Sequence, residues 1–192
     1  MQDLETQLQA AQAQRFRLIV TDGVFSMDGN VAPMDEIYAL AQKYDAMVMI
    51  DESHSAGVVG HTGGGVTELF DLRGDIELIT GTLGKAFGGA IGGFTTGKKE
   101  IVEMLRQRSR PYLFSNSIPP MVAAAGVKAF EMLSQDNTLQ DKLHENTAYF
   151  VKKMQDAASI LSPPHRQFVR SCFMTPTSPS KWQMHCLKKA FM

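Results

Sequence analysis

The chain has 192 residues, of which 44% are hydrophobic, and its formal net charge is −1, with 19 basic and 20 acidic residues. The length and apolar content are enough for one sizeable hydrophobic core. The charge balance gives no electrostatic basis for binding nucleic acid or an anionic membrane, and no apolar run approaches the roughly 20 residues that span a bilayer.

Both cysteines, Cys172 and Cys186, lie near the C-terminus and indicate neither a disulfide framework nor a zinc site. We therefore expect no metal and a reducing compartment. The acidic N-terminal residues resemble neither a signal peptide nor a transit peptide. This predicts a cytoplasmic location, or a mitochondrial one if the source is eukaryotic.

Helix-like and strand-like segments alternate along the chain. In order, we expect a helix at 2–14, a strand at 18–21, a helix at 33–44, a strand at 46–50, a short helix at 67–70 and a strand at 77–83. A weaker strand at 94–97, a helix at 98–108 and a long helical region follow; that region breaks near 136–137 and resumes from 138 to about 158. The alternation predicts an α/β fold with a mixed or mainly parallel sheet.

Polar residues follow each of the first three strands. Ser26 comes after the first strand, Asp51 to His54 after the second, and Thr82 to Lys85 after the third. Ligands of open α/β sheets bind at the carboxyl ends of the strands. We therefore expect these three clusters to converge on one site.

The glycine-rich stretch around Lys85 suggests the chemistry of that site. Alone, it would most simply be a turn with a solvated lysine, but a desolvated lysine can also form an imine with a carbonyl. Pyridoxal phosphate needs such a lysine, a carboxylate at its pyridine nitrogen and donors for its phosphate. Asp51 suits the second task, His54, three residues further on, could lie near the ring or its phenolic oxygen, and Thr82 can present a hydroxyl to the phosphate. Each of these residues, taken singly, is equally an ordinary loop or strand-end residue.

Three stretches resemble the α-oxoamine synthases, a family of fold-type I pyridoxal-phosphate enzymes. They are Thr21-Asp-Gly-Val-Phe-Ser-Met-Asp-Gly, Asp51-Glu-Ser-His-Ser-Ala-Gly and Thr80-Gly-Thr-Leu-Gly-Lys-Ala-Phe-Gly-Gly. The resemblance covers roughly residues 1–157. It implies part of the large domain of a fold-type I transferase, a three-layer α/β/α unit with a mainly parallel sheet.

The resemblance also implies roles for individual residues. Lys85 would be the aldimine lysine and the base that removes the α-proton of the substrate. Asp51 would pair with the pyridine nitrogen, and His54 and Ser26 would approach the phenolic oxygen.

Two further roles concern the cofactor phosphate. Thr82 would contact it within the chain, and Ser115 would reach it from the neighbouring subunit of a homodimer. The stretch Leu105-Arg-Gln-Arg-Ser-Arg-Pro-Tyr-Leu-Phe-Ser-Asn-Ser most resembles the family members that condense glycine with acetyl-CoA to give 2-amino-3-oxobutyrate and CoA. Another α-oxoamine synthase, of the 8-amino-7-oxononanoate or 5-aminolevulinate type, and a non-catalytic remnant remain alternatives.

The chain also departs from the family pattern. Family members are about twice as long, so the segments that would supply the histidine stacked on the ring and the arginine that binds the substrate carboxylate are not matched. His61-Thr-Gly-Gly-Gly has Gly64 where the pattern is Thr-Gly-Arg-Gly. Without its neighbouring segments, the sheet should expose apolar surface and an unpaired edge, which predicts poor solubility.

We expect three regions along the chain. Residues 1–133 would be part of the cofactor-binding large domain, and residues 134–158 the first helix of the small domain. The resemblance stops abruptly after about residue 157, and residues 159–192 show no steady apolar period. We interpret this last stretch as a tail that arose from a change of reading frame.

Overall fold

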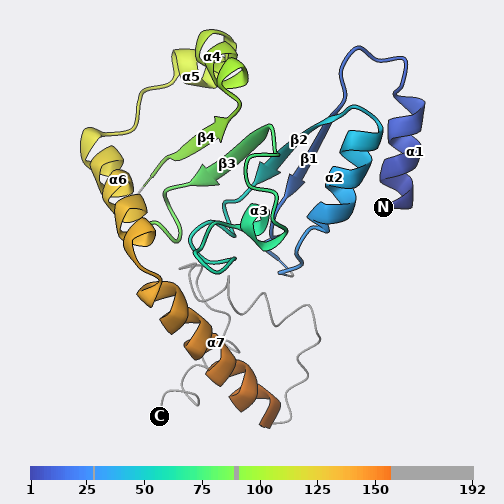
Figure 1. Cartoon of the computed structure of the whole chain (residues 1–192). Coiled ribbons are helices and arrows are strands. Elements are labelled where there is room, and N and C mark those ends of the chain that lie inside the picture. Colours follow the sequence, from blue (N-terminus) through green and yellow to red (C-terminus); the bar gives the residue numbers. More distant parts are fainter. Residues whose placement is uncertain (28, 89–90, 157–192) are drawn as a thin grey trace.

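The computed structural model describes residues 1–27, 29–88 and 91–156 (Figure 1). A four-stranded sheet lies at its centre, in the order β1 (Leu18–Asp22), β2 (Met47–Asp51), β3 (Leu78–Thr82) and β4 (Gly93–Gly97). β1, β2 and β3 are parallel, whereas β4 runs antiparallel to β3. The structure thus confirms the predicted α/β fold with a mainly parallel sheet.

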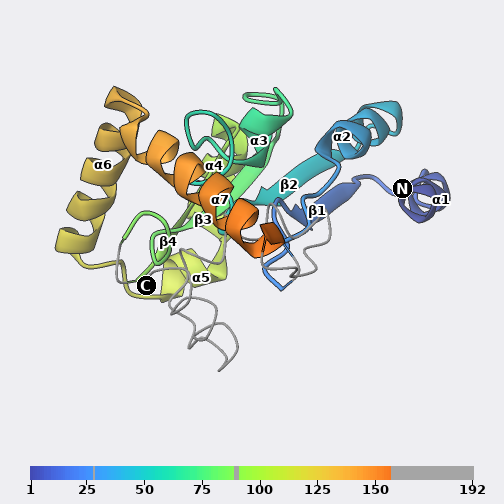
Figure 2. The same cartoon turned by 90° about the horizontal axis from the view of Figure 1, so that it is seen from below.

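Seven helices are described around this sheet, and the predicted elements recur with shifts of a few residues. They are α1 (Gln2–Ala10), α2 (Met34–Lys43), α3 (Val66–Leu69), α4 (Lys99–Arg108), α5 (Arg110–Phe114), α6 (Pro120–Gln135) and α7 (Thr138–Asp156). In Figures 1 and 2, α1 and α2 lie on the flank of β1 and β2, and α6 lies on the opposite flank, beside β4. The predicted break near 136–137 is confirmed as the junction of α6 and α7.

The main core lies between one face of the sheet and the first three helices. Val48 and Ile50 of β2 and Met34 of α2 are completely buried in it. On the other face of β1, Leu18 and Val20 are 50% and 62% exposed. Since β1 is an edge strand, the expected exposed apolar surface and open edge are both present in the described part of the chain.

A second, smaller cluster attaches α6 to the loop after β3. Leu83, Phe87 and Val122 form its buried centre. The rings of Phe87 and Phe130 have centroids 4.4 Å apart. The long helix is therefore packed against the segment that contains Lys85.

The helices differ from the prediction at two places. The first helix ends at Ala10 rather than at residue 14. The segment after it is held in a non-helical turn by the Arg17 guanidinium, which donates to the carbonyls of Gln14 at 2.9 Å and Tyr44 at 2.7 Å. The second difference is α5, which was not predicted. Its Pro111 occupies the first turn, where the missing N–H costs nothing.

The C-terminal predictions fall largely beyond the described residues. The region 159–192, interpreted as a frame-shifted tail, lies outside them, and the three-region division stays a prediction. Within the described ranges, no helix is long and apolar enough to cross a membrane.

Candidate active site

The side chains of Lys85 and His54 meet at the carboxyl edge of the parallel strands. Lys85 lies in the loop after β3, His54 lies three residues after the end of β2, and Lys85 Nζ is 2.9 Å from His54 Nε2. The pKa of His54 is below its usual value, first because burial disfavours the charged ring and then because the Lys85 charge lies beside it. Asp22 and Asp51 act in the opposite direction without outweighing these effects. A neutral ring protonated at Nδ1 can accept a hydrogen bond from the lysine at Nε2.

Two strand-end carboxylates flank this pair. Asp51 ends β2, is half-buried, and its Oδ1 accepts a hydrogen bond from the Ser53 amide at 2.8 Å. Asp22 ends β1 and lies opposite Asp51 in the parallel register. The sequence analysis singled out Ser26 after the first strand and missed Asp22. The signal that could have found it is the rule that parallel strands end side by side.

Thr82 fixes the loop that contains Lys85. Its Oγ1 accepts a hydrogen bond from the Gly84 amide at 3.1 Å and donates one to the Gly92 carbonyl at 3.2 Å. The Gly88 amide then donates to the Lys85 carbonyl at 3.0 Å. The hydroxyl therefore closes the loop from within, and its predicted role toward a phosphate stays a prediction.

The two predicted serines are placed differently. Ser26 is exposed, in the loop that the Val24–Val31 bridge closes, and Ser115 is exposed directly after α5. Among the residues that the structure describes, neither serine is hydrogen-bonded to Lys85 or Thr82. The structure thus gathers Asp51, His54, Lys85 and Thr82 around the strand ends, and the roles of the two serines remain predictions.

The buried carboxylate of Glu52 holds the segment between Asp51 and His54 in place, and the sequence analysis missed it. Glu52 is only 2% exposed and accepts a hydrogen bond from the Ser55 hydroxyl. It also accepts one hydrogen bond from the Val66 amide and one from the Thr67 amide, both of 2.9 Å. A Cβ at Gly65 would come within 2.6 Å of this carboxylate, and the φ of Gly65 is +88°. Only glycine meets both demands, so Glu52 and Gly65 together join the end of β2 to the start of α3.

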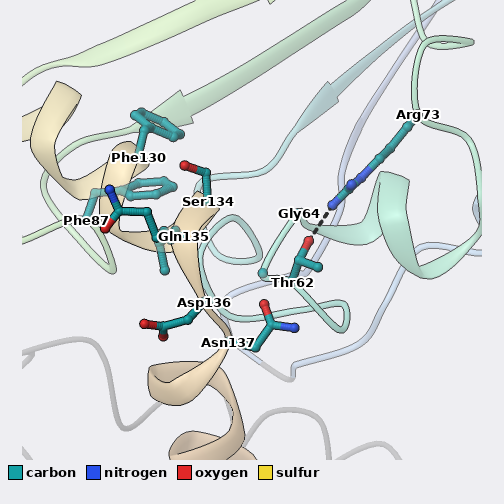
Figure 3. Close-up of a pocket in the computed structure, with 11 residues that line it drawn as sticks. Thr62, Gly64, Arg73, Phe87, Phe130, Ser134, Gln135, Asp136 and Asn137 are labelled. Atoms are coloured by element: carbon teal, nitrogen blue, oxygen red, sulfur yellow. Dashed lines mark hydrogen bonds between the residues drawn. The ribbon is translucent and has the colours of Figure 1, made fainter.

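Two cavities lie close to this site. One of about 550 Å³ lies between the 62–64 loop and the C-terminal end of α6 (Figure 3). The other, of about 360 Å³ and mainly apolar, lies beneath Ala86 and Phe87, against α6 and α7. Lys85 and His54 line neither of these two cavities. Within the described ranges, no group of three or more His, Cys, Asp or Glu residues could hold a metal ion.

Comparison with known proteins accounts for this arrangement. The sequence matches the family described as aminotransferase class I and II over residues 1–189. The chain belongs to this family. Within it, the chain is a relative of the α-oxoamine synthases, which are transferases.

Curated relatives of this branch share about half of the aligned residues. The chain is 51% identical over 164 residues to 2-amino-3-ketobutyrate coenzyme A ligase of Escherichia coli (strain K12), covering 84% of the chain and 41% of that protein. It is 49% identical over 162 residues to the mitochondrial enzyme of the same name in Homo sapiens, covering 84% and 39%. It is also 49% identical to 8-amino-7-oxononanoate synthase 1 of Bacillus subtilis (strain 168), covering 78% and 38%. The chain thus spans about two fifths of the length of these relatives.

Solved structures show the same fold. Sphingomonas wittichii serine palmitoyltransferase matches with a TM-score of 0.74 and 33% identity over 80% of this chain and 38% of that one. A high-resolution structure of SPT with a PLP internal aldimine matches with a TM-score of 0.75 and 34% identity over 81% and 39%. The described fold is therefore that of a partial fold-type I pyridoxal-phosphate transferase.

Proposed function

We propose that this chain contains the lysine-bearing half of a pyridoxal-phosphate site that condenses glycine with acetyl-CoA to give 2-amino-3-oxobutyrate and CoA. This is the activity of glycine C-acetyltransferase, also called 2-amino-3-ketobutyrate CoA ligase. The 2.9 Å contact between Lys85 and His54, beside two strand-end carboxylates, carries the proposal. The curated relatives at about 50% identity support the choice of reaction.

The chemistry of the clustered side chains fits pyridoxal phosphate. Lys85 supplies an amine for the cofactor aldehyde, and Asp51 supplies a half-buried carboxylate for the pyridine nitrogen. Ser26 and His54 would face the phenolic oxygen. When bound, the cofactor supplies an electron sink for the negative charge that develops on the α-carbon of glycine.

Proton transfer is the task of the lysine. Lys85 would take the α-proton of glycine at Nζ, and it needs to be an unprotonated amine to do so. Burial lowers the pKa of His54, and the Lys85 charge lowers it further whenever the amine is protonated, so the neutral ring is favoured. A neutral imidazole adds no second positive charge beside the amine, and it fixes the direction of Nζ through its Nε2 lone pair.

The cofactor phosphate would be held by residues of two subunits. Thr82, three residues before Lys85, would contact the phosphate within its own subunit, and Ser115 would contact the phosphate bound to the neighbouring subunit. We therefore propose a homodimer with shared sites. The exposed position of Ser115 after α5 makes it available to a neighbouring chain. Sedimentation of the purified chain with and without pyridoxal phosphate tests the dimer, and a monomer under both conditions would reject it.

One titration tests the cofactor. Pyridoxal phosphate added to the full chain should produce a visible absorption band that is absent from free protein and disappears in Lys85→Ala. Lys99→Ala, which removes a lysine of α4 that is exposed, is the matched control and should retain the band. If the parent lacks the band, or if Lys85→Ala retains it, the assignment of Lys85 is wrong.

A second candidate is 8-amino-7-oxononanoate synthesis, because the chain is 49% identical to such a synthase. The two candidates differ in their product. Formation of 2-amino-3-oxobutyrate from glycine and acetyl-CoA supports the first, whereas formation of 8-amino-7-oxononanoate supports the second. Both assays need whatever segments complete the site, so a co-expressed complementing half is the proper background.

A further inference from the structure

A side chain at position 64 would overlap the end of the Arg73 side chain, although the backbone of Gly64 does not require glycine. Its φ lies outside the left-handed region. A Cβ at this position would lie 1.9 Å from Nη2 and 2.8 Å from Cζ of Arg73. The guanidinium of Arg73 therefore occupies the space into which a side chain at position 64 would project (Figure 3).

From this position, Arg73 contacts two side chains, Thr62 and Glu68, that hold the 62–65 loop in place. Its Nη2 donates to Thr62 Oγ1 at 2.7 Å and lies 3.1 Å from Glu68 Oε2. Glu68 in turn accepts hydrogen bonds from the amides of Thr62, at 3.1 Å, and Gly64, at 2.7 Å. Burial raises the pKa of Glu68, but these hydrogen bonds and the Arg73 charge outweigh it, so the pKa lies below the usual value.

The 62–65 loop is joined by backbone hydrogen bonds to the segment that follows His54. Ala56 and Gly64 form an isolated antiparallel bridge, and the Gly57 amide donates to the Gly63 carbonyl at 2.7 Å. A Cβ at Gly57 would lie 3.0 Å from Cβ of Ala86, the residue after Lys85. A shift of the 62–65 loop therefore reaches both partners of the Lys85–His54 contact.

We propose that Arg73 is a positioning residue that, through the 62–65 loop, holds His54 and Lys85 in register. Its guanidinium reaches the space beside Gly64 from nine residues further along the chain. Gly64 and Arg73 form one unit: the glycine leaves the space, and the arginine fills it.

The test is a double-mutant cycle on the full chain. Gly64→Ala, Arg73→Ala and the double variant are compared with the parent by hydrogen exchange at the Gly57 amide. Alanine at a backbone position it can adopt ordinarily raises stability, so any loosening in Gly64→Ala reports displacement of Arg73. We expect each single change to speed this exchange roughly tenfold, and the double change to add nothing, because both remove the same charge-assisted hydrogen bonds.

A rescue variant and a control complete the design. Gly64→Arg combined with Arg73→Ala should return the exchange toward the parent rate. Arg108→Ala, at an exposed position of α4, should leave it unchanged. Additive effects in the cycle, no rescue, or faster exchange spread equally over α2 would each overturn the proposal.

Pyridoxal-phosphate affinity provides a further readout, and this one rests on the proposed function. Arg73→Ala should weaken binding several-fold while Arg108→Ala does not. A parent chain without a Lys85-dependent band would reject the cofactor assignment, but the exchange cycle would still decide the role of Arg73. If the parent shows the band and the cycle is additive, the function stands and the role of Arg73 fails.

Discussion

Replacement of Glu52 by alanine should be among the most destabilising single changes in the chain. The carboxylate is 2% exposed and accepts hydrogen bonds from two backbone amides and one hydroxyl. The Ser55 hydroxyl can rotate toward another acceptor, but the amides of Val66 and Thr67 are fixed by the first turn of α3.

The size of the effect follows from these contacts. Each buried amide left without an acceptor costs about 1–3 kcal/mol, so Glu52→Ala should lower the free energy of unfolding by about 3–5 kcal/mol. Glu52→Gln keeps one oxygen but turns an NH₂ group toward an amide donor, and we expect a loss of about 2 kcal/mol. A domain with a stability of about 5–15 kcal/mol would lose a large part of it.

Urea unfolding followed by far-UV circular dichroism measures this effect. Glu36→Ala, at an exposed position in the first turn of α2, is the matched control and should cost less than about 1 kcal/mol. Equal midpoints for Glu52→Ala and Glu36→Ala would show that the reasoning about buried amides is wrong. A slope for a variant that differs from the slope for the parent would instead show a changed denatured state or unfolding that is not two-state.

Three further changes test other contacts of the fold. Burial raises the pKa of Glu77, but its bonds to Lys98 and to the Val48 amide of β2 outweigh burial, so the pKa lies below the ordinary glutamate value. The stabilisation is therefore complete above that ordinary value and lost as the pH falls through the folded pKa, so the free energies of unfolding of the parent and Glu77→Gln should converge in acid. Thr82→Val should cost about 1 kcal/mol in urea unfolding and weaken pyridoxal-phosphate binding, while Thr82→Ser should restore both, and equal behaviour of the two variants would contradict the loop-closing role. Phe130→Ala removes a ring that is 44% exposed and stacked on the loop after β3, and should lower the thermal midpoint by the equivalent of about 1–2 kcal/mol, whereas Phe114→Ala, at 80% exposure, should not.

Much of the fold could be predicted because its signals are local. The continuous apolar run at 46–50 predicts a strand buried on both faces. The strand is present, with Val48 and Ile50 fully buried on one face, whereas Met47 and Met49 on the other face are only half-buried. The boundary of α1 could not be predicted in this way. It depends on Arg17, which bonds to carbonyls at the far end of α2, and such a contact leaves no periodic trace.

The candidate site shows the same division. Lys85 and His54 could be placed together, because both follow strands that end at one edge of the sheet. The roles of Glu52 and Arg73 could not be predicted, because each depends on a glycine of another segment that lies against the side chain in the folded protein. Spacing along the chain does not reveal which glycine leaves room for which side chain.

The packing of the Phe87 ring against the Phe130 ring links the Lys85 loop to α6. Phe87 is 8% exposed and lies two residues after Lys85, so the Lys85 amine and the long helix α6 are attached to the same short piece of backbone. A packed contact of this kind transmits displacement instead of absorbing it. A displacement of α6 should therefore also move the backbone that carries Lys85.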